Sequence, residues 1–175
     1  LFIIIGIASL KTTSLEIRKA NDFDWGPILE VGKLFLGIFI TIAPVLAMLK
    51  VGADGHFAPL VNLAHDAQGG PINSVYFWMS GMLSAFLDNA PTYLVFFNLA
   101  SGDPIELMHN MPNTLLAVSM GSVFMGALSY IGNAPNFMVK AIAEQNRVKM
   151  PSFFGYMAWS FGILVPLFIL HTLIF

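Results

Sequence analysis

Apolar residues along this chain fall into long runs that are separated by short polar stretches. A run of about 20 apolar residues can cross a membrane as a helix, whereas a run of about 10 residues cannot. The pattern therefore predicts two uninterrupted spans and two apolar segments with a polar interruption, preceded by a short helix that we interpret as truncated. In chain order these elements are 1–10 (truncated helix), 25–50 (span), 74–100 (interrupted), 114–145 (interrupted) and 152–175 (span).

The two interruptions share one short motif, Asn-Ala-Pro followed by a polar and then an aromatic residue. The first is Asp88-Asn89-Ala90-Pro91-Thr92-Tyr93, and the second is Gly132-Asn133-Ala134-Pro135-Asn136-Phe137. Because proline removes a backbone donor and clashes with the preceding turn, each motif is expected to break its helix, over 88–92 and over 131–136. Paired breaks in apolar segments are typical of the ion or substrate site of a transporter.

Composition places the chain in a membrane. Apolar residues make up 57% of it and charged residues only 10%, with a mean hydropathy of +0.75, whereas a soluble domain has about 25% charged residues. The net charge of −2 provides no basic patch for nucleic acid, and the absence of cysteine excludes disulfides and thiolate metal sites. We therefore expect an all-α, multi-pass integral membrane protein.

The segment 74–100 has two possible arrangements in the membrane. Its first part, 74–87, is 14 residues long, so as a helix it rises roughly 21 Å against a hydrocarbon core of about 30 Å. It cannot span alone. The segment is either one broken spanning helix or a re-entrant hairpin that returns to the side it entered from.

The distribution of Lys and Arg favours the hairpin. Cytoplasmic loops are enriched in these residues, and here two loops carry three each while two carry none. Only a hairpin that enters from outside puts both basic loops on the same side. Lys50, at the outer end of the first span, is the one residue that does not fit. The basic loops are 11–24 and 140–149, and the neutral ones are 51–73 and 101–113.

The polar groups at the two breaks suit a hard cation such as sodium, which prefers oxygen ligands. The candidates are the carboxylate of Asp88, the side-chain amides of Asn89, Asn133 and Asn136, the hydroxyls of Ser84 and Thr92, and carbonyls near Ala90, Gly132 and Ala134. Half-helices that begin at Thr92 and Asn136 would instead favour an anion at their N-termini. Both uses are compatible with one site.

Asp88 is the only carboxylate predicted near the middle of the membrane. An acidic side chain at that depth costs roughly 2.5 to 3.5 kcal/mol, which favours a functional role. Protons and sodium ions would then compete for one carboxylate, and this competition is sufficient for antiport. The structural alternative is that Asp88 caps the helix that follows it.

Structural roles are also open to the other polar residues. Asn89, Asn133 and Asn136 could satisfy frayed backbone without binding an ion. Ser119, Ser122 and Ser129 share one small helix face with Gly126, and such faces serve helix packing more often than ion binding.

The motifs resemble one repeat of the ion transporter superfamily, which includes NhaD-type sodium/proton antiporters and citrate and dicarboxylate carriers. The resemblance rests on Ser84-Ala85-Phe86-Leu87-Asp88-Asn89, followed about 40 residues later by Tyr130-Ile131-Gly132-Asn133-Ala134-Pro135-Asn136 and then by Ala141-Ile142-Ala143-Glu144. It covers nearly the whole chain. The motif Asp-Asn-Ala-Pro-Thr-Tyr is most similar to that of bacterial proteins described as sodium/proton antiporters or citrate transporters.

The resemblance implies an inverted-repeat transporter in which each half supplies a re-entrant helical hairpin and a discontinuous transmembrane helix. This chain is similar to the C-terminal half, and the N-terminal repeat would provide a second ion site. The implied sodium-binding residues are Asp88, Asn89 and Thr92 at the hairpin tip and Gly132, Asn133 and Asn136 in the broken helix. Carboxylate carriers of the superfamily often have a Ser-Asn-Thr tip, and the acidic tip here fits cation/proton exchange better.

We therefore expect a secondary active transporter in the bacterial inner membrane, with sodium/proton antiport through Asp88 as the leading hypothesis and sodium-coupled citrate or dicarboxylate uptake as the alternative. Two alternatives from other functional classes are a structural membrane subunit without transport activity and a membrane-embedded enzyme. The enzyme would need a second catalytic group at depth, so we expect no enzyme. No cofactor is expected, and the expected partners are the lipid bilayer, sodium ions, protons, the N-terminal repeat and a second copy in a homodimer.

Overall fold

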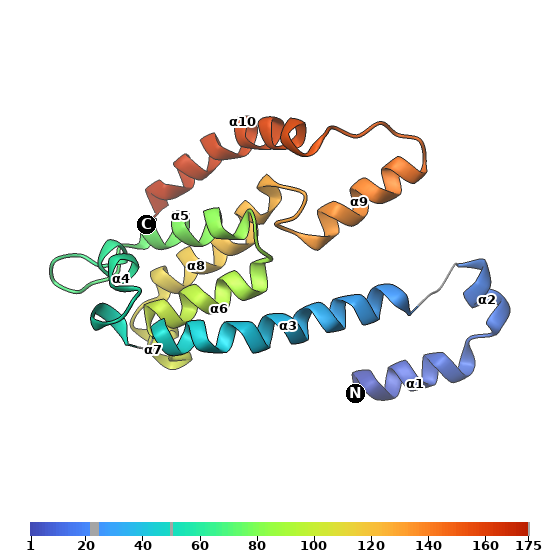
Figure 1. The fold of residues 1–175 in the computed structure, drawn as a ribbon, viewed down its shortest axis with the longest axis horizontal. Helices are drawn as coiled ribbons and strands as arrows, with labels where there is room; N and C mark the ends of the chain where they lie inside the picture. The colour runs from blue at the N-terminus through green and yellow to red at the C-terminus, as the bar shows by residue number, and fades with distance from the viewer. Residues whose placement is uncertain (22–24, 50, 175) are drawn as a thin grey trace. The chain divides into compact units, whose positions relative to one another are not determined.

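The computed structural model describes residues 1–21, 25–49 and 51–174, which form α-helices and short 3₁₀ helices without a β-strand. The expectation of an all-α chain is thus confirmed for the described residues (Figure 1). The chain divides into two compact units, Leu1–Ile40 and Thr41–Phe175. Lys50, the residue that does not fit the predicted topology, lies outside the described residues.

The first unit contains two short helices and most of a long one. They are α1 (Phe2–Thr12), α2 (Leu15–Ala20) and α3 (Gly26–Leu49), and α3 ends in the second unit. The α3 helix has 24 residues and continues through Pro44, so it is about 36 Å long. The predicted polar loop at 11–24 contains α2, whose N-cap Ser14 accepts a hydrogen bond from the Ile17 amide.

The second unit holds the two interrupted segments and the last helix (Figure 1). Its α-helices are α4 (Ala58–Ala64), α5 (Asn73–Ser84), α6 (Asn89–Ala100), α7 (Pro104–His109), α8 (Pro112–Phe124), α9 (Ala134–Gln145) and α10 (Phe153–His171). The 3₁₀ helices among the described residues of this unit are η1 (Gly52–Asp54), η2 (Met125–Leu128) and η3 (Thr172–Ile174). The α5 and α6 helices form a hairpin, and α8 packs against both of its arms.

Both helix breaks lie closer to the N-terminus than the sequence predicts. The first is the hairpin tip, residues 85–88, and the second, which we call the helix break, is residues 129–133. Pro91 and Pro135 therefore belong to the first turns of α6 and α9. Proline is tolerated there because the amides of a first turn have no partner within the helix. The Asn-Ala-Pro motif starts the second half-helix rather than forming the break.

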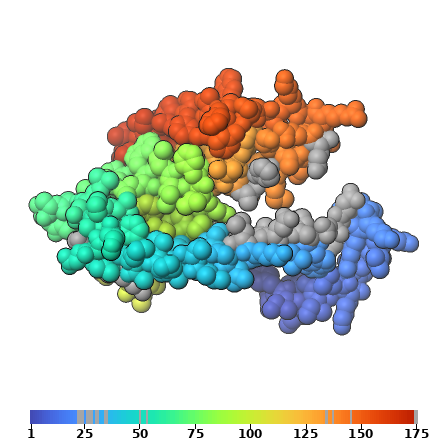
Figure 2. Space-filling view, in the orientation of Figure 1, coloured from blue at the N-terminus to red at the C-terminus, as the bar shows by residue number. Residues whose placement is uncertain are grey.

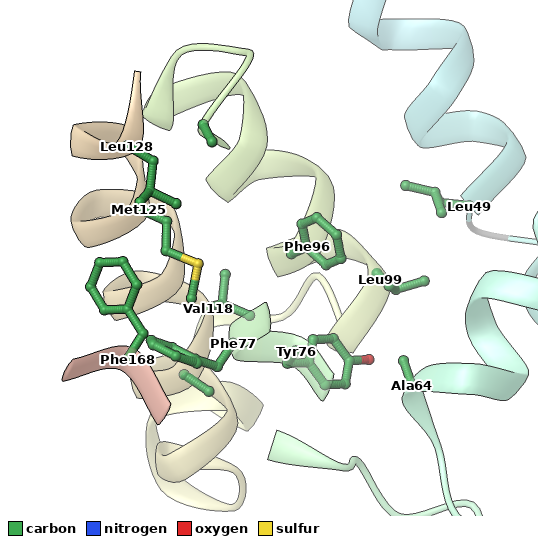
Figure 3. Packing of buried hydrophobic residues seen from close by; sticks show 12 residues of the cluster. Leu49, Ala64, Tyr76, Phe77, Phe96, Leu99, Val118, Met125, Leu128 and Phe168 are labelled. Atoms are coloured by element: carbon green, nitrogen blue, oxygen red, sulfur yellow. The ribbon is translucent and has the colours of Figure 1, made fainter. Parts of the chain in front are cut away.

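Buried apolar side chains from several of these helices meet in one core (Figure 3). Phe77 of α5 and Phe168 of α10 make an edge-to-face contact with ring centroids 6.2 Å apart, and Met125 and Val118 lie beside them. In Figure 2 the red atoms of α10 lie over the green atoms of α5. The core thus links the hairpin to the last helix.

The interface between α5 and α8 depends on glycine. A Cβ at Gly121 would overlap the Phe77 carbonyl oxygen and the Ser80 hydroxyl, and a Cβ at Gly81 would overlap Met125. Small residues that bring backbones together are typical of helix pairs in membranes. Ser80 and Ser84 are fully buried in this interface, which agrees with a packing role for the small polar faces.

We expect Gly121→Ala to destabilise the protein by about 1–3 kcal/mol, because the backbone of α5 would have to move away from α8. The measurement is thermal unfolding of the purified protein in detergent. Gly162→Ala in α10 is the matched control, because a Cβ there meets nothing within 4 Å. Equal stability of the two variants would contradict the close packing of α5 on α8.

Among the described residues, one helix is long and apolar enough to cross a membrane, namely α10 with 19 residues. Shorter apolar helices are Phe2–Thr12, Leu36–Leu49 and Pro112–Leu128.

Candidate functional site

The hairpin tip presents Asp88 at the start of α6. Its backbone is extended (φ −61°, ψ 151°) and occupies the N-cap position, but its side chain makes no capping hydrogen bond. The residue is half-buried. The buried Thr92 donates its hydroxyl to the Asp88 carbonyl oxygen at 3.0 Å, so the first turn of α6 is closed by Thr92. The Asp88 carboxylate is thus not used for capping.

The helix break is organised by a serine that the sequence analysis placed on a packing face. The Ser129 hydroxyl oxygen accepts hydrogen bonds from the amides of Ile131 at 3.2 Å and Gly132 at 3.0 Å. This arrangement folds the backbone into a turn before Asn133, the N-cap of α9. Like Asp88, Asn133 is extended (φ −152°, ψ 116°) and makes no side-chain capping bond.

The hairpin tip and the helix break touch each other. The Ser129 hydroxyl donates to the Ala85 carbonyl oxygen at 2.5 Å, and the Ser84 hydroxyl donates to the Ser122 carbonyl oxygen at 2.5 Å. Both hydrogen bonds are buried, and each joins the end of α5 to the region of α8 and the break. Ser84 and Ser129 therefore hold the two interruptions together.

Gly132 lies at the centre of this contact. A Cβ built on it would lie 2.6 Å from the Ser84 carbonyl oxygen and 2.8 Å from the carbonyl oxygens of Ala85 and Gly126. Three backbone oxygens thus converge on one glycine. The oxygens pack against the glycine itself, so position 132 has no room for a side chain. The sequence analysis named carbonyls near Ala90, Gly132 and Ala134 as candidate ligands, and these are different from the three oxygens that meet at Gly132.

Two buried polar atoms nearby have no hydrogen-bond partner among the described residues. They are the Ser122 hydroxyl oxygen and the Asn136 side-chain nitrogen. A buried polar atom without a partner carries a free-energy cost unless a ligand or water satisfies it. These atoms therefore leave bonding capacity beside the place where the breaks meet.

The other predicted ligands at the two breaks are Asp88, Asn89, Asn133 and Asn136. In the part of the chain that the structure describes, no side-chain hydrogen bond joins Asp88 or Asn89 to Asn133 or Asn136. No group of three or more His, Cys, Asp and Glu residues is found among the described residues.

A helical hairpin and a broken helix whose interruptions meet through backbone oxygens are typical of secondary transporters. The chain matches the family described as putative citrate transport over residues 1–175 and belongs to that family. It is therefore a membrane transport protein and not an enzyme, and its resemblance to citrate carriers is confirmed at the level of the family. No curated protein and no solved structure matches it.

Proposed function

We propose that this chain forms the ion-binding part of a secondary active transporter that moves citrate together with a cation, most simply sodium. The observation that carries this proposal is the convergence of three carbonyl oxygens on Gly132, between the hairpin tip and the helix break. The family description supports citrate as the cargo. We therefore propose citrate transport, the alternative in the sequence analysis, ahead of sodium/proton antiport.

In this proposal the cation is held by oxygen atoms from both interruptions. Asp88 supplies the negative charge, and the carbonyl wall around Gly132 supplies neutral ligands. The remaining ligands come from the other predicted site residues: Ser84, Asn89, Thr92, Asn133 and Asn136. A bound cation neutralises Asp88, so an anionic cargo can approach a tip that would otherwise repel it.

The helix N-termini provide a place for a carboxylate beside that cation. The first turns of α6 and α9 have amides without helical partners, and the side chains of Asp88 and Asn133 do not cap them. Uncapped amides at a helix N-terminus are natural donors to a carboxylate. Cation and carboxylate would thus occupy neighbouring positions in one site.

Sodium/proton antiport is the second candidate, and Asp88 is the observation that favours it. A single half-buried carboxylate at the tip can hold either a proton or a sodium ion. In that mechanism Asp88 carries the proton, and no organic cargo is needed.

The finer architecture is also part of the proposal. We infer a multi-pass protein of the bacterial inner membrane in which 74–100 is a re-entrant hairpin that enters from outside, and 114–145 is a discontinuous span. The N-terminal repeat of the same protein would complete the inverted pair and contribute a second cation site. A homodimer is the assembly we expect.

The test is transport by the full-length protein in proteoliposomes. We expect an inward sodium gradient to drive accumulation of radiolabelled citrate, and replacement of sodium by potassium to abolish it. Proton flux is followed in the same vesicles with a pH-sensitive dye. Sodium-driven proton movement without citrate uptake would overturn the citrate proposal in favour of antiport.

A further inference from the structure

A second site lies between the helix break and the connection from α9 to α10. It is a cavity of about 500 Å³, and a neighbouring cavity of about 300 Å³ continues along the connection. The larger cavity is lined by Tyr130, Ile131, Lys140, Glu144, Lys149, Met150, Pro151, Ser152 and Phe153. Tyr130 and Ile131 belong to the helix break, but none of the cavity residues is among the cation ligands proposed above.

The charges around the two cavities are mostly positive. Lys140 holds both oxygens of Glu144 at 2.8 and 2.9 Å, and its ammonium lies 5.5 Å from the centre of the Tyr130 ring. Lys149 lines both cavities and Arg147 lines the smaller one. Neither forms a salt bridge with a residue that the structure describes. Three cations thus surround one carboxylate that is already paired.

Arg147 occupies a backbone position that normally suits glycine. Its φ is +62°, and the amides of Arg147 and Val148 bond back to the carbonyls of Glu144 and Ala143. This is the helix-terminating arrangement in which glycine is preferred, because a side chain at positive φ is strained. The Arg147 side chain thus lies beside the smaller cavity at a position where backbone conformation alone would favour glycine.

The cavity lies at the start of α10, the one described helix that is both long and apolar enough to cross a membrane. The α10 helix begins at Phe153 and rises about 29 Å, close to the thickness of the hydrocarbon core. Its start therefore lies near one membrane boundary, where lipid headgroups are found. Beside it, Phe154 is 78% exposed and Trp159 71% exposed, as expected for side chains that face acyl chains and the interface.

We propose that this cavity binds the phosphate group of an anionic membrane lipid. Lys149 and Arg147 supply the positive charge. Lys140 can contribute a third positive charge when it exchanges its bond to Glu144 for one to the phosphate. The N-terminus of α10 adds a favourable dipole. Basic pockets beside membrane helices at the cytoplasmic boundary bind acidic headgroups in this way. The exposed apolar surface of α10 accommodates the acyl chains. This inference does not depend on which cargo is transported.

The test compares lipid binding by variants of the full-length protein. Binding is measured by native mass spectrometry with added phosphatidylglycerol, and phosphatidylcholine is the zwitterionic comparison. We expect wild type to prefer phosphatidylglycerol, and Lys149→Gln and Arg147→Gly each to weaken that binding about fivefold. Arg147→Gly is informative because it relieves the positive-φ strain, so weaker binding would not reflect a damaged fold.

The matched control is Lys19→Gln, which removes an exposed cation from α2 of the other unit. It should leave lipid binding unchanged, and an equal loss in this variant would overturn the proposal by showing that only net charge matters. If inorganic phosphate displaces phosphatidylglycerol and the site shows no preference for the lipid, the site binds a soluble phosphate rather than a lipid headgroup, and the lipid proposal is overturned. Competition by citrate alone, or binding that none of the variants changes, would overturn the site.

Discussion

Asp88→Asn is expected to abolish cation-coupled transport while changing the stability of the protein by less than about 1 kcal/mol. Asparagine has nearly the same shape as aspartate and is an equally good N-cap residue, so α6 can still begin at position 89. The variant loses only the negative charge and the ability to carry a proton. Sodium-driven citrate uptake and sodium-driven proton movement are both measured in proteoliposomes, and stability is measured by thermal unfolding in detergent.

Asp103→Asn is the matched control, because Asp103 also occupies a helix N-cap. Its carboxylate is exposed and accepts hydrogen bonds from the amides of Ile105 at 2.8 Å and Glu106 at 3.4 Å, which asparagine can replace. We expect this control to transport normally. Undiminished sodium-dependent transport by Asp88→Asn would remove Asp88 from the mechanism under both functional hypotheses.

The existence of two interruptions could be predicted from sequence, whereas their positions could not. Proline indicated that each helix was disturbed, but the same residue is compatible with the interior of a break and with the first turn of a new helix. Local sequence does not distinguish these two. The structure selects the first turn at Pro91 and Pro135 because the turns before them are fixed by long-range contacts.

Those contacts explain why the carbonyl wall at Gly132 was not predicted. Its oxygens belong to Ser84, Ala85 and Gly126, and they meet only because α5 and α8 approach closely along their glycines. Ser129 had one local signal, since a serine three residues before a glycine can bond to the intervening amides. Its bond to Ala85, 44 residues away, depends on tertiary packing that no local pattern contains.

The polar faces of the two segments also show what local sequence can predict and what depends on tertiary contacts. Ser80 and Ser84 are four residues apart, so they share one face of α5, and both are buried. Spacing alone does not tell which of these serines serves helix packing and which could bind an ion. The structure uses the Ser84 hydroxyl to bind the backbone of Ser122 and leaves the Ser122 hydroxyl without a partner among the described residues.

Gly132→Ala is the second variant with a large expected effect. The new Cβ would lie within 2.8 Å of three carbonyl oxygens, and backbone atoms cannot turn aside as a flexible side chain can. The hairpin tip and the helix break must therefore separate. We expect a destabilisation of about 1–3 kcal/mol and an increase of about tenfold or more in the sodium concentration that gives half-maximal transport.

Ligand-induced stabilisation separates damage to the site from general damage to the fold. A protein that binds sodium gains about 1.4 kcal/mol at a sodium concentration ten times its Kd, so thermal unfolding is measured with sodium and with potassium. Gly121→Ala should lower stability in both salts but keep the sodium-specific increment, because the atoms that its Cβ would overlap belong to Phe77, Ser80 and Gly81 rather than to the two breaks. Gly132→Ala should lose that increment. If Gly132→Ala keeps it in full, the carbonyl oxygens around Gly132 do not bind the cation, and the site must be sought around Asp88 alone.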